Sequence, residues 1–291
     1  MKSKAIVIAL SASLVACDSA TEKHQAEAVI DTIVSDQVIT NQNASLAKNT
    51  ASKGFGPQSP RDLESANGSN ARIFNDAPAY NELSLCNIHF HKNAEHKGGE
   101  YTKYAGNGDG HGFQTGYIYA GQLSTDELKP SSNEVCSSKH GGLASGDTIE
   151  VHYVHSSAQV KPGSTLKSCL SDTNMNPQLR VEGQVYVLVN DKNALNFVEL
   201  TKFDEINGRY QALNIPNNTG TPIQYAGSTT GPGYNEQGSP LQVSWSVRPQ
   251  VAKVNIDTVA EWCKGNAFNE DHAHGVRNLV INPDLLSPIK P

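Results

Sequence analysis

Two histidines separated by one residue, His89 and His91, are the residues of this chain that best fit a metal site. In a β-strand, side chains two positions apart point to the same face, so both imidazoles would lie side by side while Phe90 turns toward a core. A third imidazole from His152 would complete a three-histidine site with one tetrahedral position open. An open position is typical of catalytic rather than structural zinc, so the pattern predicts an enzyme.

Residues near these histidines fit the support that a metal ligand needs. Alternation along the strand of His152 would place Glu150 and Val154 on the same face as that histidine. A metal-bound histidine usually donates its second ring N–H to an acceptor. Glu150 would accept from His152, and Asn87 would accept from His89. Val154 would form an apolar wall near the open position.

Other histidines are expected to have different roles. His155 alternates to the opposite face of its strand and is expected to pack or hydrogen-bond there. His272 and His274 form a second pair with one residue between them. They lie among polar residues and glycine without strand alternation, which predicts a surface loop. His111 and His140 lie in glycine-rich loops and are expected to face solvent.

The segments that must hold these residues are expected to be β-strands. Short apolar or alternating stretches rich in Val, Ile and Tyr recur between turn signals, without the amphipathic helices that a parallel α/β fold needs. The expected fold class is therefore β-dominated α+β. The strands are expected at residues 83–91, 115–120, 148–155, 184–189, 197–200 and 241–247, and a helical turn at 258–264.

Length and composition suit one catalytic domain behind an export signal. The chain has 291 residues and a net charge of −6, which gives no electrostatic reason to expect nucleic acid as a partner. Residues 1–17 have a positive start and a short apolar run, which predicts a signal peptide. The polar residues 18–53 predict a flexible tether, and residues 54–291 the single catalytic domain.

The end of the signal segment resembles a bacterial lipobox, Leu14-Val-Ala-Cys17, in which lipid is attached to the cysteine sulfur. The resemblance implies a membrane anchor at Cys17 and a periplasmic location. An ordinary secretory signal is the alternative, and it would also export the protein. Asp18 resembles an inner-membrane retention signal, which makes the inner membrane a weaker expectation.

Export to an oxidising compartment predicts two disulfides among Cys86, Cys136, Cys169 and Cys263. Three pairings are possible, and the sequence does not separate them. None of the four cysteines forms a CxxC pair, which disfavours thiolate metal ligands.

Several segments resemble the carbonic anhydrases. Cys86–His96 and Glu150–His155 are similar to motifs of the δ class, whose motifs are close to those of the α class. Gly54–Asp62 resembles the QSPxD segment that opens the family's catalytic domain. Gly227–Pro232 and Val243–Val247 resemble its GSxTxP loop and the strand that follows. These matches occur in the family's order along the chain.

The resemblance implies a zinc enzyme that reversibly hydrates carbon dioxide to bicarbonate and a proton, by attack of zinc-bound hydroxide on CO2. Its fold would have a large, twisted, mostly antiparallel central sheet. One Zn²⁺ per chain would be held by His89, His91 and His152. No protein partner is implied. Three imidazoles also suit cobalt, iron or cadmium, so the sequence does not fix the metal.

Two further roles follow from the resemblance. Glu95 would accept a proton from a threonine hydroxyl, which would aim the zinc-bound hydroxide. Thr230 fits this role by ungapped alignment of the loop, with Thr229 as the alternative.

The chain also departs from the α-class pattern. That class commonly carries a proton-shuttling histidine ahead of the histidine pair, and there is none between Pro60 and Asn87. By their proximity to the motifs, His96, His111 and His140 are candidates for the proton relay.

Two other functions are alternatives to carbon dioxide hydration. A cupin-type metalloenzyme shares the pattern His89-x-His91-x-x-x-Glu95, but the glycines of the cupin motif and the PxG turn before His152 are missing. A non-catalytic periplasmic zinc-binding lipoprotein would need closed coordination or histidine-rich exchange loops, and the N-terminal segment has only His24.

Overall fold

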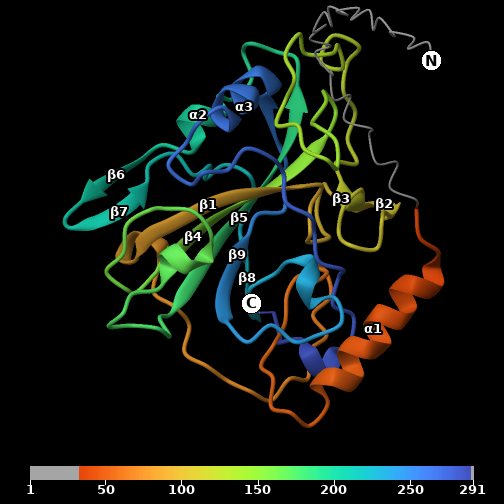
Figure 1. The fold of residues 1–291 in the computed structure, drawn as a ribbon, viewed down its shortest axis with the longest axis vertical. Coiled ribbons are helices and arrows are strands. Elements are labelled where there is room, and N and C mark those ends of the chain that lie inside the picture. Colours follow the sequence, from red (N-terminus) through yellow and green to blue (C-terminus); the bar gives the residue numbers. More distant parts are fainter. Residues whose placement is uncertain (1–32, 290–291) are drawn as a thin grey trace, which may run out of the picture.

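A six-stranded mixed sheet forms the centre of the protein in the computed structural model, which describes residues 33–289 (Figure 1). The strand order is β1-β4-β5-β9-β8, and β10 also pairs with β5. Their bounds are β1 Ser84–Lys92, β4 Thr148–Ser156, β5 Leu179–Val189, β8 Ile223–Ser228, β9 Gln242–Val247 and β10 Ala252–Asn255. The β1–β4, β4–β5 and β8–β9 pairs are antiparallel, whereas β9 and β10 run parallel to β5. The predicted β-dominated fold with a mostly antiparallel sheet is confirmed.

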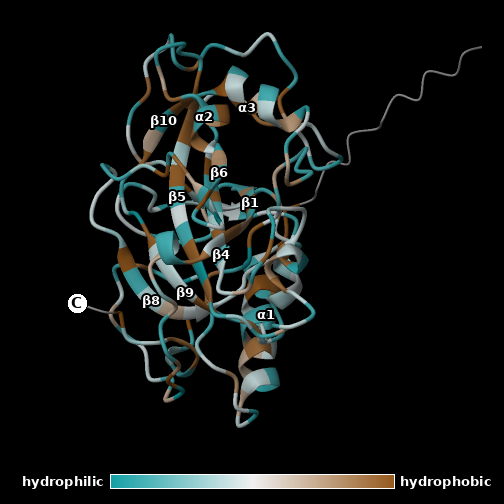
Figure 2. Ribbon diagram, turned by 90° about the vertical axis from the view of Figure 1, so that its left-hand side faces the viewer, coloured by the Kyte–Doolittle hydropathy of each residue, from teal (hydrophilic) through white to brown (hydrophobic). Residues whose placement is uncertain are grey.

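Each face of this sheet buries its own apolar cluster. On the helix face, Phe90 of β1 and Tyr153 of β4 pack in one cluster with α2 (Phe197–Leu200) and α3 (Ile256–Cys263). The second half of β5, beside α2, is its apolar half (Figure 2). On the pocket face, side chains of β4, β5 and β9 form the other cluster. Its members from these strands are Val154, Leu179, Val181, Val185, Val243, Trp245 and Val247.

The helix predicted near residue 258 is confirmed as α3, but the strand predicted at 197–200 is wrong, because these residues form α2. Asn196 caps this short helix, since its side chain accepts a hydrogen bond from the Glu199 amide at 3.2 Å. Phe197 then packs edge-on against Trp262 of α3, with ring centroids 5.2 Å apart. Apolar residues in so short a stretch suit a buried helix as well as a strand.

A 15-residue helix, α1 (Asp36–Thr50), lies within the segment predicted to be a flexible tether over 18–53. Gln42 donates to the Gly110 carbonyl at 2.8 Å, and Leu46 is buried. The apolar partners of Leu46 are Val280, Leu285 and Leu286. This part of the chain therefore differs from the prediction. The segment is polar on average, but a few residues along one face of α1 pack against the rest of the protein.

Predictions for the first 32 residues lie outside the described part of the chain. They include the signal peptide, the lipidation of Cys17 and the role of Asp18. Among the described residues, no helix has both the length and the apolar character needed to cross a bilayer.

Two disulfides are present, which confirms the predicted number and decides between the three pairings. Cys86 pairs with Cys169, and Cys136 pairs with Cys263. The first belongs to the apolar cluster of the pocket face and the second to that of the helix face. One cross-link therefore closes each side of the sheet.

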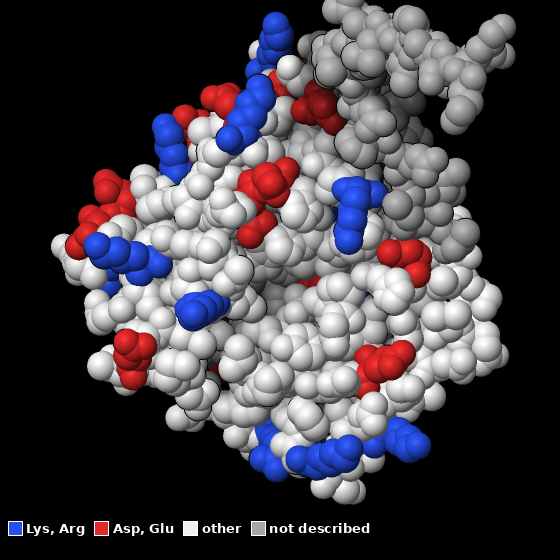
Figure 3. Space-filling view, in the orientation of Figure 1, with Lys and Arg blue, Asp and Glu red and all other residues white. Residues whose placement is uncertain are grey.

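Two hairpins lie outside the central sheet, β2–β3 (Lys103–Asn107 and Thr115–Ile118) and β6–β7 (Phe203–Ile206 and Arg209–Ala212). The remaining elements are short 3-10 helices, η1 Tyr80–Glu82, η2 Leu166–Cys169, η3 Pro232–Tyr234 and η4 Pro283–Leu285. On the face shown in Figure 3, acidic and basic side chains of the described residues are interspersed with uncharged surface. That face has no broad patch of one sign to attract a charged macromolecule.

Candidate metal centre

Strands β1 and β4 bring the three predicted histidines together. His89 lies directly opposite His152 in the antiparallel pair, and His91 is on the same face of β1. Phe90 points the other way and is fully buried in the helix-face cluster. One ring nitrogen from each histidine lies within 4.8 Å of those of the other two.

The tautomer of His89 is fixed by Asn87. The Asn87 amide nitrogen donates to the Gly163 carbonyl at 3.0 Å, so its oxygen is the atom that faces His89 Nδ1 at 2.6 Å. His89 Nδ1 must therefore carry the proton, which leaves a lone pair on Nε2. This is the support that the sequence predicted for Asn87.

A backbone carbonyl does the same for His91. His91 Nδ1 lies 3.0 Å from the Gly275 oxygen, which can only accept, so Nε2 again carries the lone pair. This Nε2 is buried and has no hydrogen-bond partner. Sequence reasoning missed Gly275, because a contact made by a main-chain carbonyl leaves no signature in residue type.

The third histidine is oriented by a carboxylate. His152 Nε2 lies 3.3 Å from Glu150 Oε1, an imperfectly aligned contact, so Nδ1 is left facing the site. His152 Nδ1 is 3.3 Å from His89 Nε2. Two nitrogens that both present lone pairs at this distance repel each other unless a cation lies between them. The residues present therefore fit a metal ion held by three imidazoles.

Burial keeps these imidazoles neutral. It lowers the pKa of His91 to about 3 and moves the pKa values of His89 and His152 below the ordinary 6.5. Neutral imidazole is the form that binds a metal.

Glu150 is held by more than His152. Its Oε1 lies 2.6 Å from His96 Nδ1, and its Oε2 accepts from the backbone amides of Glu95 and His96 at 2.7 and 3.2 Å. Burial alone would raise the pKa of Glu150, but His96 and His152 hold it well below its usual value. The carboxylate is therefore ionised and fixed in position.

His96 is part of this scaffold rather than a proton relay to solvent. Its Nε2 lies 2.7 Å from the Tyr225 hydroxyl, which is 2.9 Å from Ser59 Oγ. The ring is fully buried against Trp245, with centroids 4.8 Å apart. The relay role predicted for His96 is therefore wrong, because both ring nitrogens are engaged and no face of the ring reaches solvent.

The two other relay candidates lie outside the site. His111 is exposed, and His140 stacks on Phe113 with ring centroids 3.4 Å apart. Phe113 lines the pocket that contains the three histidines, but His111 and His140 do not.

The predicted Glu95 and Thr230 also meet at this site. Glu95 is buried, and its Oε1 accepts from the Arg277 amide at 2.7 Å. Burial raises the pKa of Glu95, and a contact with the Thr230 hydroxyl acts in the opposite direction. The Thr229 hydroxyl instead lies 2.6 Å from Ser239 Oγ. Thr230 is thus nearer to the expected role than Thr229, but the second Glu95 oxygen has no hydrogen-bond partner in the structure, so the aiming role of Thr230 stays a prediction.

The three histidines open into a cavity of about 350 Å³. Its apolar wall includes Val154, as predicted, and Trp245 packs against His152 with ring centroids 4.9 Å apart. The other apolar lining residues from η2, β5 and β9 are Leu166, Leu179, Val181 and Val243. A small, largely apolar chamber next to a metal-binding cluster suits a small uncharged substrate.

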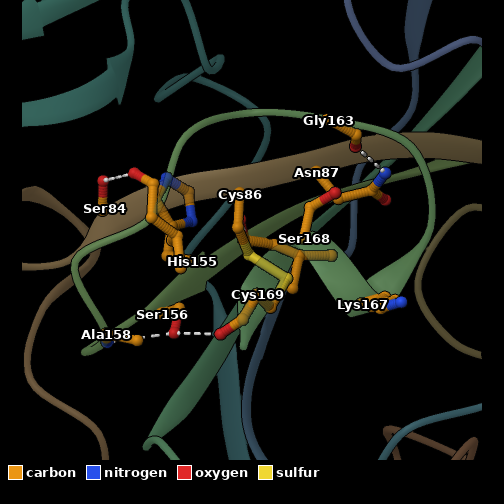
Figure 4. The surroundings of a disulfide bond; sticks show 12 residues. Ser84, Cys86, Asn87, His155, Ser156, Ala158, Gly163, Lys167, Ser168 and Cys169 are labelled. Carbon is orange, nitrogen blue, oxygen red and sulfur yellow. Dashed lines mark hydrogen bonds between the residues drawn. A yellow bond between two sulfur atoms is a disulfide. The ribbon is translucent and has the colours of Figure 1, made fainter. Parts of the chain in front are cut away.

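Figure 4 shows the Cys86–Cys169 disulfide, which lies beside lining residues of the cavity. The Cys86–Cys169 disulfide ties η2 to β1, next to Asn87. The Gly163 amide donates to the Cys86 carbonyl at 3.0 Å, and Thr165 and Leu166 follow as lining residues. This cross-link thus supports both the wall of the cavity and the amide that orients His89.

The second histidine pair lies in a surface loop, as predicted, but this loop is close to the first pair, which the sequence did not show. His272 and His274 both line the cavity. The His274 amide donates to the Phe90 carbonyl at 2.9 Å and forms an isolated bridge with His91. The short spacing of the pair was a usable signal, but a single bridge gives no strand alternation to show where the segment lies.

The family described as Delta carbonic anhydrase matches residues 80–258. No curated protein matches the sequence. A hyperthermostable carbonic anhydrase from an active hydrothermal vent chimney is 13% identical, covering 81% of this chain and 92% of that chain, with a TM-score of 0.31. The α-carbonic anhydrase of Thermovibrio ammonificans is 17% identical. The match covers 78% of this chain and 84% of that chain, with a TM-score of 0.26.

The α-carbonic anhydrase of Photobacterium profundum is 16% identical, covering 85% of this chain and 96% of that chain, with a TM-score of 0.26. TM-scores this low carry no structural argument. The family match is different in kind, because it spans more than half of the 291 residues and contains all three histidines. The chain belongs to the Delta carbonic anhydrase family and is a carbonic anhydrase.

Proposed function

We propose that the protein catalyses the zinc-dependent, reversible hydration of carbon dioxide at His89, His91 and His152. The observation that carries this proposal is the set of three acceptors behind the imidazoles. Asn87, Gly275 and Glu150 each engage the outer nitrogen of one ring, so three lone pairs converge on one point. When bound, Zn²⁺ would lower the pKa of a coordinated water to about 7 and so supply hydroxide, a magnitude that carbonic anhydrase itself exemplifies.

The roles of the other residues follow from their contacts. Thr230 would donate its hydroxyl proton to Glu95, whose other oxygen is fixed by the Arg277 amide. The Thr230 oxygen is then left as an acceptor facing the cavity, where it would fix the direction of the attacking oxygen. Val154 and Trp245 exclude water from the side on which CO2 would lie.

The test is metal analysis combined with stopped-flow CO2 hydration on the mature full chain. We expect about one zinc per chain and hydration well above the rate in buffer alone. Iron or manganese with Glu95 as a fourth ligand would instead indicate a cupin-type enzyme. An intact zinc site with no acceleration would indicate the zinc-binding lipoprotein.

We also propose that the protein is exported and anchored to the membrane by lipid on Cys17, with Asp18 favouring the inner membrane of the periplasm. The lipobox-like Leu14–Cys17 segment supports this. Metabolic labelling with palmitate in the native host, followed by membrane fractionation, tests it. The matched variant Cys17→Ser should lose the label and leave the membrane fraction, and retention of both would contradict the proposal.

A further inference from the structure

We propose that His272 carries the proton released in each turnover from the cavity to solvent. This inference rests on the proposed function, because hydration of one CO2 yields one bicarbonate and one proton, and that proton must leave before the next cycle. Water in the cavity gives the proton to a ring nitrogen of His272, and His272 then gives it to a buffer base outside. No oxidant or further reactant is needed.

The first supporting observation is the distribution of ionisable groups. Among the described residues that line the cavity, only three are ionisable apart from the metal-binding histidines. These are Glu270, His272 and His274, all within one short segment. The rest of the wall is apolar or carries hydroxyl and amide groups, which do not exchange protons readily near neutral pH.

The second observation is that His272 connects the cavity to the surface. It lines the cavity, yet its side chain is 45% exposed. Its Nδ1 contacts the Asp271 carboxylate, which fixes the ring and leaves Nε2 toward exchange partners. An imidazole with one nitrogen held by an acceptor and the other accessible is suited to accept and release protons.

The third observation is that His274 holds His272 in place. The two rings are nearly parallel, at an interplanar angle of 8° with centroids 6.0 Å apart. His274 Nε2 lies 2.6 Å from Glu270 Oε2, and its backbone is bound to β1. We therefore assign His274 and Glu270 as positioning residues. The titratable and charged groups that face His272 are thus Asp271 and His274, with Glu270 behind the latter.

The decisive experiment compares zinc-loaded wild type and His272→Ala by stopped-flow CO2 hydration in dilute and in concentrated imidazole buffer. In dilute buffer we expect kcat to fall on the order of tenfold with kcat/KM unchanged, because proton release and not CO2 attack is slowed. Concentrated imidazole should restore kcat. His111→Ala, which removes an exposed histidine outside the cavity, is the matched control and should match wild type in both buffers.

Two readouts separate this role from a structural one. Zinc content should be the same in wild type and His272→Ala. In the wild type, the ring resonances of His272 followed by NMR should change over the same pH range as kcat. Wild-type kcat for His272→Ala in dilute buffer, or a deficit that imidazole does not restore, would overturn the inference alone. No hydration by zinc-loaded wild type would overturn the proposed function instead.

Discussion

The pocket face and the helix face of the central sheet each bury a histidine from β4, His152 and His155. Burial lowers the pKa of both rings, that of His155 to about 3. His155 Nδ1 lies 3.0 Å from the Tyr153 carbonyl and its Nε2 has no partner, while its ring packs near Tyr80. A buried neutral imidazole with an unpaired nitrogen is therefore not by itself a metal site. On the pocket face, in contrast, the ring of His152 meets the rings of two other histidines at one site.

The two faces also differ in what stands behind the histidine. His152 has the ionised Glu150, which is itself fixed by His96 and two backbone amides. His155 has a main-chain carbonyl from its own strand and the neighbouring Arg180, which adds to the lowering of its pKa. The pocket face thus stabilises a cation next to its histidine, whereas the helix face opposes one.

The largest effect should come from removing one of the three histidines that meet on the pocket face. His91→Ala deletes one of the three nitrogens, so we expect loss of zinc and a hydration rate no higher than in buffer alone. The matched variant on the other face, His155→Leu, should keep both zinc and activity. Metal analysis and stopped-flow hydration measure the two variants, and loss of zinc in His155→Leu would break the comparison between the faces.

A smaller effect is expected within the loop that closes the pocket face. Thr230→Val removes the hydroxyl that meets Glu95, and loss of one preorganised hydrogen-bonding group costs on the order of 10²-fold in kcat. Thr229→Val is the control, because its hydroxyl bonds to Ser239. It should change kcat far less. Equal losses in the two variants would mean that the loop contributes by its shape and not by the Thr230 hydroxyl.

The contrast between the faces also explains what could be predicted from the sequence. Period-two alternation was enough to group His89, His91 and His152 and to turn Phe90 and His155 away, because register across one strand pair decides both. Alternation does not describe a segment that touches the sheet at a single bridge, so the sequence does not show that the surface loop of His274 lies beside His91.

Local patterns also failed where tertiary contacts decide the structure. The residues of α2 predict a strand as readily as a helix, because a four-residue apolar stretch has no period long enough to distinguish the two. The partners of His96 lie at Glu150 and Tyr225, far away in the chain, so no local pattern showed that it is fully enclosed.

The two disulfides give a third way to sharpen the comparison. Replacing either pair by serines should lower the free energy of unfolding by roughly 2–5 kcal/mol, since each closes a long loop. Only Cys86→Ser/Cys169→Ser should also weaken zinc binding, on the order of tenfold, because it frees the loop that holds Asn87 against His89. Urea unfolding and zinc titration against a chelator measure both. Equal zinc affinity in the two double variants would mean that the Cys86–Cys169 disulfide is not needed to hold Asn87 in place.

The smallest effect concerns pH and the helix face alone. His155 has a folded pKa of about 3 against an ordinary 6.5, so the unfolded state takes up its proton first as the pH falls. Its contribution to stability is therefore fully present above about 6.5 and is lost progressively toward pH 3. His155→Leu takes up no such proton, so its free energy of unfolding should fall less steeply with decreasing pH, by up to about 1.4 kcal/mol per unit.

Urea unfolding between pH 8 and 4 tests this, with the difference in slope expected only below about pH 6.5. The zinc-loaded protein is the proper sample, because bound zinc keeps the metal-binding histidines from titrating over most of that range, and the remaining histidines are the same in both proteins. If the two slopes are equal there, His155 is protonated or solvated in the folded protein. The helix face would then tolerate a cation, and only the meeting of three histidines at one site would distinguish the pocket face from it.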